Sequence, residues 1–211
     1  MHIEDFQTNT TVITEAGKLL RRLHTSGIKF LGAFDPVKGI IDYVNILEQK
    51  GFAERFEGWD KIYKVVQQVD AAYKKNPPPQ APCHNDVLAE NFMYDGKTMM
   101  LIDWEYGGIL PYPTSFARLI AHAESSENAL FFMAPEDRDF AVDYYYDELL
   151  RDKGISREAW HYALECALFY EYCEGVFVGN RYGATDSGYY KKYLPAARRQ
   201  ADKLLSMGGI N

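Results

Sequence analysis

Apolar side chains recur every three or four residues along the first third of the chain, which is the spacing of amphipathic helices. The pattern predicts helices around residues 16–23, 40–47 and 62–72. Asp35 followed by Pro36 is typical of the start of the second helix, because aspartate caps a helix and proline fits its first turn. This part of the chain is therefore expected to be mostly helical.

The period of the pattern changes after residue 75. The segment NPPPQAP, residues 76–82, interrupts helical structure and is expected to form an extended connector. Within residues 91–103, apolar-rich runs flank Asp95-Gly96, and this combination is the strongest short signal for a β-hairpin. We therefore expect one small hairpin in the middle of the chain.

The helical spacing returns after Pro113. Four further helices are expected, at residues 114–124, 136–153, 157–181 and 187–206. Pro195 is expected to start or bend the last of them. The predicted fold class is therefore mostly α (α+β), and the predicted organisation is a single domain over residues 1–211.

Composition and charge narrow the classes of function. The net charge of −7 argues against a nucleic-acid partner, because phosphate backbones bind basic faces. The apolar runs are too short to cross a membrane, and the N-terminus lacks the pattern of a targeting segment. Cys83, Cys166 and Cys173 show no CxxC spacing and are expected to be small buried side chains in a reducing compartment. We therefore expect a cytoplasmic protein without membrane or nucleic-acid contacts.

Small polar side chains gather around the predicted hairpin. An antiparallel pair returns its ends to within roughly 5 Å of each other, so Asn91 and Asp103 are expected to be neighbours. Asp86 lies five residues before Asn91, in the loop that leads into the hairpin. Two carboxylates and an amide oxygen suit magnesium, and a carboxylate that does not bind the metal can accept a proton from a hydroxyl.

Each of these residues alone is more readily explained by structure than by function. Asp and Asn are common in loops because their side chains bond to nearby backbone, and a single His84 is more often a hydrogen-bonded structural histidine. The combination of HxDxxxxN, a hairpin and IDWE is far more specific than its parts. It favours a functional site.

This combination resembles the catalytic loop of choline kinases and aminoglycoside phosphotransferases, which are small-molecule relatives of protein kinases. His84, Asp86 and Asn91 match the HxDxxxxN motif, and IDWEY at residues 102–106 is most similar to the choline/ethanolamine kinase branch. The resemblance implies a protein-kinase-like helical C-lobe whose small hairpin carries the catalytic loop. It also implies phosphoryl transfer from ATP, with Asp86 as catalytic base, His84 supporting the loop, and Asn91 and Asp103 holding Mg²⁺.

On the acceptor side, the resemblance implies a small amine-bearing alcohol, choline or ethanolamine, held by aromatic rings. Tyr106 and Tyr189 match two aromatics of the family's cage. Glu105 is placed with them among the substrate-binding residues, and it either binds a second metal ion or fixes the loop. Where the family has two tryptophans, this chain has Glu174 and Phe177. Phe177 is assigned either to the substrate pocket or to a core stripe, and both interpretations stay open.

The chain departs from the family pattern in two places. Ser115 stands where the family has an aspartate that accepts hydrogen bonds from the catalytic-loop backbone, and a neutral hydroxyl is a weaker acceptor. Only 83 residues precede His84, no GxGxxG occurs, and residues 1–6 resemble the hinge between kinase lobes. We therefore expect the N-lobe to be absent from this chain.

Absence of the N-lobe has consequences for activity and assembly. Without its lid and lysine, the chain alone is expected to phosphorylate choline very poorly. The face that an N-lobe covers is expected to be apolar, and to form a homodimer or bind a separate N-lobe partner. The alternatives are a fragment, a mis-started product, a degenerate relative or half of a two-chain enzyme. The competing functions are a non-catalytic binding domain and a kinase for an aminoglycoside or amino sugar.

Overall fold

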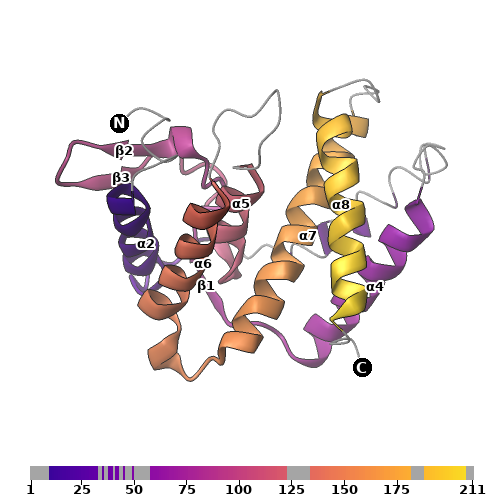
Figure 1. Ribbon diagram of the computed structural model, residues 1–211, viewed down its shortest axis with the longest axis horizontal. Helices are drawn as coiled ribbons and strands as arrows, with labels where there is room; N and C mark the ends of the chain where they lie inside the picture. Colours follow the sequence, from indigo (N-terminus) through magenta and orange to yellow (C-terminus); the bar gives the residue numbers. More distant parts are fainter. Residues whose placement is uncertain are drawn as a thin grey trace. The chain divides into compact units, whose positions relative to one another are not determined.

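The structure is a computed structural model that describes residues 10–32, 35, 38–39, 41–42, 45, 49, 58–122, 134–181 and 188–207. The elements follow in the order α2 (Thr10–His24), α4 (Trp59–Lys75), β1 (Gln80–Cys83), the 3-10 helix η2 (Ala89–Asn91), β2 (Phe92–Tyr94), β3 (Met99–Leu101), β4 (Gly108–Pro111), α5 (Thr114–His122), α6 (Pro135–Leu149), the 3-10 helix η3 (Arg151–Lys153), α7 (Arg157–Arg181) and α8 (Gly188–Ser206) (Figure 1). No helix in this part of the chain is long and apolar enough to cross a membrane.

The chain forms two compact units, and each is assembled from two separate stretches. The first unit contains Met1–Ala33 and Pro79–Leu164, and the second contains Phe34–Pro78 and Glu165–Asn211. Helix α7 contributes residues to both. The predicted single domain stays a prediction, and the two units are described separately.

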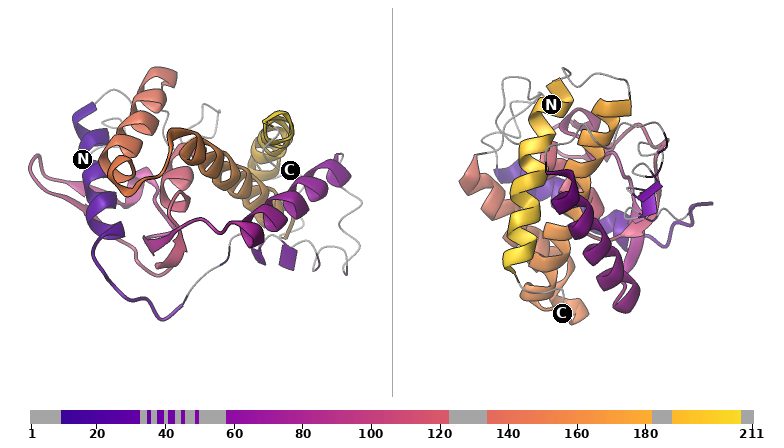
Figure 2. Two further views of the ribbon diagram at one scale, coloured as in Figure 1. Left: turned by 90° about the horizontal axis from the view of Figure 1, so that it is seen from below. Right: turned by 90° about the vertical axis from the view of Figure 1, so that its right-hand side faces the viewer.

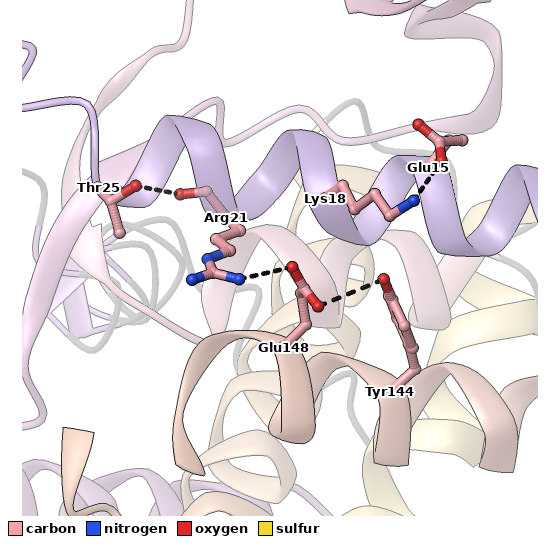
Figure 3. A network of polar contacts seen from close by, with 6 residues as sticks. All are labelled: Glu15, Lys18, Arg21, Thr25, Tyr144 and Glu148. Carbon is pink, nitrogen blue, oxygen red and sulfur yellow. Dashed lines mark hydrogen bonds and ion pairs between the residues drawn. The ribbon is translucent and has the colours of Figure 1, made fainter. Parts of the chain in front are cut away.

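In the first unit, α2 lies beside α6 (Figure 1). Helix α2 buries most of the apolar face that the sequence predicts: Ala16, Leu20 and Leu23 are buried, and Leu19 is half-buried. At the surface of this contact, Arg21 donates to Glu148 at 2.8 Å (Figure 3). An exposed pair of this kind stabilises a fold by only about 0–1 kcal/mol, so apolar burial holds the two helices together.

An aromatic cluster forms the centre of the first unit. Tyr145 stacks on Trp160 with ring centroids 5.0 Å apart and on Phe116 at 4.5 Å, and Tyr112 stacks on Trp160 at 6.0 Å. Trp160 and Tyr145 are completely buried. Such rings contribute large buried areas and fix the positions of α5, α6 and the start of α7 relative to β4.

The first unit contains two separate antiparallel strand pairs, where the sequence predicts only one. Strands β2 and β3 form the expected hairpin, with Phe92 opposite Leu101. Strand β1 pairs with β4, with Cys83 opposite Gly108. The expectation that residues 76–82 form a plain connector is therefore wrong for their second half. Pro82 lacks a backbone donor, which weakens any sequence signal for a strand at this position.

The hairpin is shorter than predicted. Its strands are joined by a four-residue loop, because Tyr94 pairs with Met99. The carboxylate of Asp95 accepts hydrogen bonds from the backbone N–H groups of Lys97 and Thr98. Gly96 has a φ of 94°, which suits glycine in such a loop. The turn is therefore at Asp95-Gly96 as predicted, but the side chain of Asp95 widens it.

In the second unit, α4 packs beside α8 (Figure 2). Ile62, Val65 and Val69 of α4 are buried, as their spacing predicts. Helix α7 joins α8 through polar contacts, because Gln200 donates to the backbone carbonyl of Glu165 at 3.0 Å.

The remaining helix predictions are largely confirmed. The predicted helix at 157–181 coincides with α7, and Pro195 lies inside α8 rather than at its start. The predicted helix at 136–153 ends early as α6 and continues as the separate 3-10 turn η3. The carboxylate of Asp35 accepts a hydrogen bond from the backbone of Lys38, as expected of a cap. Residues 40, 44 and 47 of that helix, and 123–124 after α5, lie outside the described residues.

Replacement of Gly175 by alanine tests the packing of α7 on α8. An ideal Cβ at Gly175 lies 2.5 Å from Cγ of Tyr193, whose side chain is buried. We expect Gly175→Ala to lower the free energy of unfolding by about 1–3 kcal/mol through overpacking. Urea denaturation gives the measurement. Gly32→Ala is the matched control, because nothing lies within 4 Å of its Cβ. Equal stability of the two variants would contradict the close contact.

Candidate functional site

His84 lies directly after β1, at the centre of the candidate site. Its side chain is 0% exposed, and its Nε2 lies 2.8 Å from the carbonyl oxygen of Ile102. Burial lowers the pKa of His84, which favours the neutral ring. A neutral ring donates from Nε2 to this carbonyl, so His84 ties the loop after β1 to the segment after β3. This agrees with its predicted role as a supporting residue.

Asp86 and Asn91 are brought together as the motif predicts. Asn91 donates from Nδ2 to the backbone carbonyl of Asp86 at 2.8 Å and to its Oδ2 at 3.0 Å. Asn91 is the last residue of η2 rather than the first residue of a strand, and it is 7% exposed. Because both Nδ2 protons are directed at Asp86, Oδ1 is the atom of Asn91 that is available to ligate a cation.

Asp103 is next to Asn91 through the hairpin ladder. The backbone N–H of Ile102 donates to the carbonyl of Asn91 at 3.0 Å, and Asp103 follows immediately, two residues beyond the end of β3. Its side chain is exposed, and its carboxylate has no hydrogen bond or ion pair among the described residues. The predicted proximity of Asn91 and Asp103 therefore follows from the observed ladder.

Two residues of the site have left-handed backbone conformations. Asn85 has a φ of 62° and Asp103 a φ of 65°, and no other non-glycine residue in the described ranges has a positive φ. Asn and Asp tolerate this region better than other residues, but it still costs free energy relative to ordinary conformations. Backbone strain is therefore concentrated next to Asp86 and at Asp103.

Arg118 of α5 binds Asp86, a contact that the sequence does not predict. It donates to Oδ1 of Asp86 from Nη2 at 2.9 Å and from Nε at 3.3 Å. No local pattern links a residue in the middle of a helix to a loop 32 positions earlier. The sequence indicates this contact only indirectly, because Arg118 is a charged residue among the mostly apolar residues of α5.

Trp104 also contributes to the site without having been predicted. Its ring meets His84 edge-on at 4.5 Å and stacks on Phe30 at 6.5 Å. Its Nε1 donates to the carbonyl of Leu101 at 2.9 Å. Gly107 allows this arrangement, because a Cβ there would lie 2.6 Å from the ring of Phe30. Trp104 and Phe30 therefore help to keep His84 away from water.

The predicted acceptor residues fall into two groups. Glu105 and Tyr106 belong to the first unit, and 59% of Tyr106 is exposed. The charge of Glu105, which also accepts a hydrogen bond from the hydroxyl, raises the pKa of Tyr106. Phe177 in α7 and Tyr189 in α8 belong to the second unit, and their side chains lie outside the described residues. Their assignment to a substrate pocket stays a prediction.

Ser115 differs from its predicted role. It is completely buried, and its hydroxyl lies beside the thiol of Cys83 without an ordinary hydrogen-bond partner among the described residues. Burial raises the pKa of Cys83 to about 11, so the thiol stays protonated. The expectation that Ser115 weakly replaces the aspartate of the family is therefore wrong: in this chain it fills space behind the catalytic loop.

A buried polar chain supports β1 from the side of α2. Nε2 of His24 lies 3.6 Å from the sulfur of Cys83, and its Nδ1 lies 3.2 Å from the hydroxyl of Tyr145. That hydroxyl donates to the carbonyl of Tyr112 at 3.2 Å. A neutral ring satisfies this chain, with Nδ1–H donating to Tyr145 and Nε2 accepting from the thiol. Burial, with a smaller contribution from Lys153, lowers the pKa of His24 to about 4.

The donor set fits a magnesium ion better than a softer metal. Within the described ranges, no group of three or more His, Cys, Asp or Glu side chains is placed to hold a metal. Asn91 and Asp103 instead offer one amide oxygen and one unpaired carboxylate. Magnesium usually takes one or two protein carboxylates and completes its shell with water and phosphate.

Comparison with known proteins gives the same assignment as the motif. The sequence pattern of the phosphotransferase enzyme family matches residues 2–149. The chain is 26% identical to protein LicA of Haemophilus influenzae (strain Rd) over 192 residues, which cover 88% of this chain and 67% of LicA. For a second LicA from Haemophilus influenzae the match covers 53% of that protein.

Solved structures share the fold. A choline/ethanolamine kinase family protein from Mesorhizobium loti has a TM-score of 0.74 at 22% identity, over 95% of this chain and 64% of that one. LicA in complex with AMP has a TM-score of 0.71 at 16% identity, over 92% of this chain and 63% of that one. The predicted resemblance and the predicted kinase-like, mostly helical fold are confirmed. The chain spans less than two thirds of either structure.

The pKa of His24 leads to a prediction about acid stability. The unfolded chain binds a proton at His24 below about pH 6.5, whereas the folded chain does so only near pH 4. The unfolded state therefore binds more protons between these values, and stability falls as pH decreases through this window. We expect the wild type to lose on the order of 2–3 kcal/mol more than His24→Gln between pH 7 and pH 4. Urea denaturation at several pH values measures this difference, and parallel curves for the two proteins would contradict it.

Proposed function

Because the chain belongs to the phosphotransferase enzyme family, we propose that the site around Asp86 transfers a phosphoryl group from ATP to the hydroxyl of a small amino alcohol. The observation that carries the proposal is the joint placement of Asp86, Asn91 and Asp103 by one loop and one hairpin. The chain covers 67% and 53% of the two LicA proteins that it matches. The activity of the whole protein is therefore part of the proposal.

Asp86 is the proposed catalytic base. Its carboxylate is 15% exposed, and Asn91 holds it at the end of a loop fixed by His84. In this role Asp86 orients the acceptor hydroxyl and takes its proton as the oxygen attacks phosphorus. Positioning of this kind is the main contribution of a protein to phosphoryl transfer.

Asn91 and Asp103 are the proposed ligands of Mg²⁺. Asn91 contributes Oδ1, and Asp103 contributes a carboxylate that is exposed and has no partner among the described residues. When bound, the ion neutralises charge on the phosphates of ATP. The left-handed backbone at Asp103 supports this role, since strained conformations cluster at functional sites.

The exposed face of the β2–β3 hairpin is the proposed contact surface for the adenine ring. Met93 and Met100 are opposite each other on β2 and β3 and are about half exposed, and Ile102 continues the same side of the chain. Along the chain, Ile102 directly precedes Asp103, and Met93 follows Asn91 by two positions. An exposed apolar strip next to metal ligands suits a nucleotide, whose base is flat and whose phosphates are charged. A solved structure of LicA contains AMP, although that likeness concerns the fold alone.

Choline or ethanolamine is the proposed acceptor, and Glu105 and Tyr106 are its proposed contacts in the first unit. A carboxylate beside an exposed aromatic ring attracts a cationic amine through charge and cation–π interaction, which contributes about 0.5–2 kcal/mol. The contacts predicted at Phe177 and Tyr189 belong to the second unit and stay predictions. The choline/ethanolamine kinase family structure supports this choice of substrate class.

An aminoglycoside is the second candidate acceptor. The complex of gentamicin with APH(2'')-IIa has a TM-score of 0.54 at 15% identity, over 95% of this chain and 66% of that one. Its lower TM-score favours the amino alcohol. A non-catalytic binding domain is the third candidate, and the intact set of Asp86, Asn91 and Asp103 argues against it.

The first prediction for this function concerns metal binding. We expect Mg²⁺ with ATP to raise the melting temperature of the chain, because a ligand that binds only the folded state stabilises it. Asp103→Ala should remove this shift, and it should lower the melting temperature without ligand only modestly, because the side chain is exposed but alanine tolerates the φ of 65° less well than aspartate. Asp139→Ala, an exposed aspartate of α6, is the control and should keep the shift. A full shift in Asp103→Ala would remove Asp103 from the metal site.

The second prediction concerns catalysis. We expect transfer of labelled phosphate from ATP to choline or ethanolamine to be slow but dependent on Asp86. Asp86→Asn should lower the rate by on the order of 10²–10⁴-fold, which is the usual contribution of a positioned base. Thin-layer separation of the labelled product gives the measurement, with kanamycin as the competing acceptor. If kanamycin is labelled and choline is not, the acceptor is an aminoglycoside, the second candidate. If no acceptor gives a labelled product that depends on Asp86, phosphoryl transfer is rejected.

A further inference from the structure

The carboxylate of Asp86 accepts hydrogen bonds from residues of two different elements. Arg118 in α5 donates twice to Oδ1, at 2.9 and 3.3 Å, and Asn91 in η2 donates to Oδ2 at 3.0 Å. The ion pair is sheltered, with 22% of the Arg118 side chain and 15% of the Asp86 side chain exposed. Partly buried pairs are screened less by salt than surface pairs, so this contact constrains Asp86 more than an ordinary surface bridge would.

The two oxygens of Asp86 are used unequally. A carboxylate has about four lone-pair positions, two on each oxygen. Among the described residues, two N–H groups of Arg118 occupy both lone-pair positions of Oδ1. Asn91 occupies only one of the two lone-pair positions of Oδ2. Oδ2 therefore keeps one open position for a further donor such as an alcohol hydroxyl.

We infer that Arg118 is a positioning residue for the proposed phosphoryl transfer. It fixes the rotation of the Asp86 carboxylate, so that Oδ2 is the oxygen that meets the acceptor hydroxyl. The inference rests on the proposed function, because it assigns Arg118 a role only through Asp86. It adds a residue, and a choice between two oxygens, that the HxDxxxxN pattern does not contain.

The support of Arg118 makes it suitable for this role. Helix α5 is packed into the first unit by Phe116, Ala117 and Leu119, all buried, and the N–H of Ala117 donates to the carbonyl of Pro113 at 2.9 Å. A guanidinium on such a helix presents its N–H groups in a fixed plane, whereas a lysine presents a single mobile ammonium group. Rigid support is what holds a catalytic group within a few tenths of an ångström of a productive geometry.

Asp86 lies in a region of negative charge. Glu105, Asp86 and Asp103 each raise the pKa of Tyr106, so all three carboxylates are within electrostatic range of its hydroxyl. Like charges repel, and the single hydrogen bond from Asn91 to Oδ2 leaves the Asp86 carboxylate able to rotate about its own axis. The guanidinium of Arg118 holds Oδ1 on the side of α5 and opposes this rotation.

The first arm of the test reads the position of Asp86 without any measurement of activity. The side-chain amide of Asn91 donates to the Asp86 carboxylate and to the Asp86 backbone carbonyl, so its ¹H–¹⁵N signals report where that carboxylate lies relative to its own backbone. We expect these signals to move in Arg118→Gln and to return part of the way in Arg118→Lys, which keeps the charge. Arg21→Gln is the matched control, because Arg21 pairs with Glu148 on another face of the same unit. Unchanged Asn91 signals in Arg118→Gln would overturn the inference.

The second arm uses the rate of labelled phosphate transfer. We expect Arg118→Gln to lower kcat by about 100-fold, which is the cost of misplacing a catalytic group by roughly 1 Å, and to leave KM for both substrates unchanged. Arg118→Lys should recover part of kcat, and Arg21→Gln should match the wild type. In the Asp86→Asn background, Arg118→Gln should have no further effect on kcat, because the inferred role of Arg118 is to position Asp86.

The outcomes separate the inference from the function on which it rests. Additive effects of Asp86→Asn and Arg118→Gln on kcat would overturn the inference while leaving phosphoryl transfer in place. A wild-type rate in Arg118→Lys would also overturn it, since charge alone would then suffice. No Asp86-dependent transfer in the wild type would reject the proposed function, and the Asn91 signals would still decide whether Arg118 positions Asp86. Melting temperatures of all variants show whether each one folds.

Discussion

The hydrogen bond from Nε2 of His84 to the carbonyl of Ile102 joins the two loops that carry the candidate site. One loop leaves β1 and contains Asp86, and the other leaves β3 and contains Asp103. The bond requires a proton on Nε2, and burial of the ring against Trp104 lowers its pKa and favours the neutral form that carries this proton. Loss of the packing against Trp104 would let water compete for the Ile102 carbonyl and loosen the link between the base and the proposed metal ligand. Apolar packing at this point therefore controls polar geometry several residues away.

The strand pair β1–β4 is the second condition for the site. It places Cys83 opposite Gly108, so the start of the catalytic loop and the end of the IDWEY segment lie at the same end of one ladder. His24 and Tyr145 support this end from within the first unit. A polar chain of this kind is stable only while each member has a partner, which makes the loop sensitive to changes in residues that never touch a substrate.

Much of this arrangement was predictable from the sequence, because the relevant signals are local. Helix α7 shows the expected bounds, since its apolar spacing is long and uninterrupted. The Asp95-Gly96 turn and the spacing of Asp86, Asn91 and Asp103 led to the correct neighbours. The β1–β4 pair was not predicted, because Pro82 weakens the sequence signal for the four-residue strand β1. The contact of Arg118 with Asp86 was not predicted, because the two residues are 32 positions apart. Contacts of this second kind depend on tertiary packing, which no short pattern encodes.

The interleaving of the two units has a consequence for synthesis on the ribosome. Helix α4 lies in the first half of the chain, but it packs against α8 at the other end of the described sequence. The entire stretch from β1 to α6, which belongs to the other unit, is translated between them. During this interval the apolar stripe of Ile62, Val65 and Val69 has no α8 to cover it, and nascent chains with such uncovered surfaces tend to aggregate. The second unit therefore cannot complete its folding until α8 has been synthesised, and closure of a long loop of intervening chain slows the step.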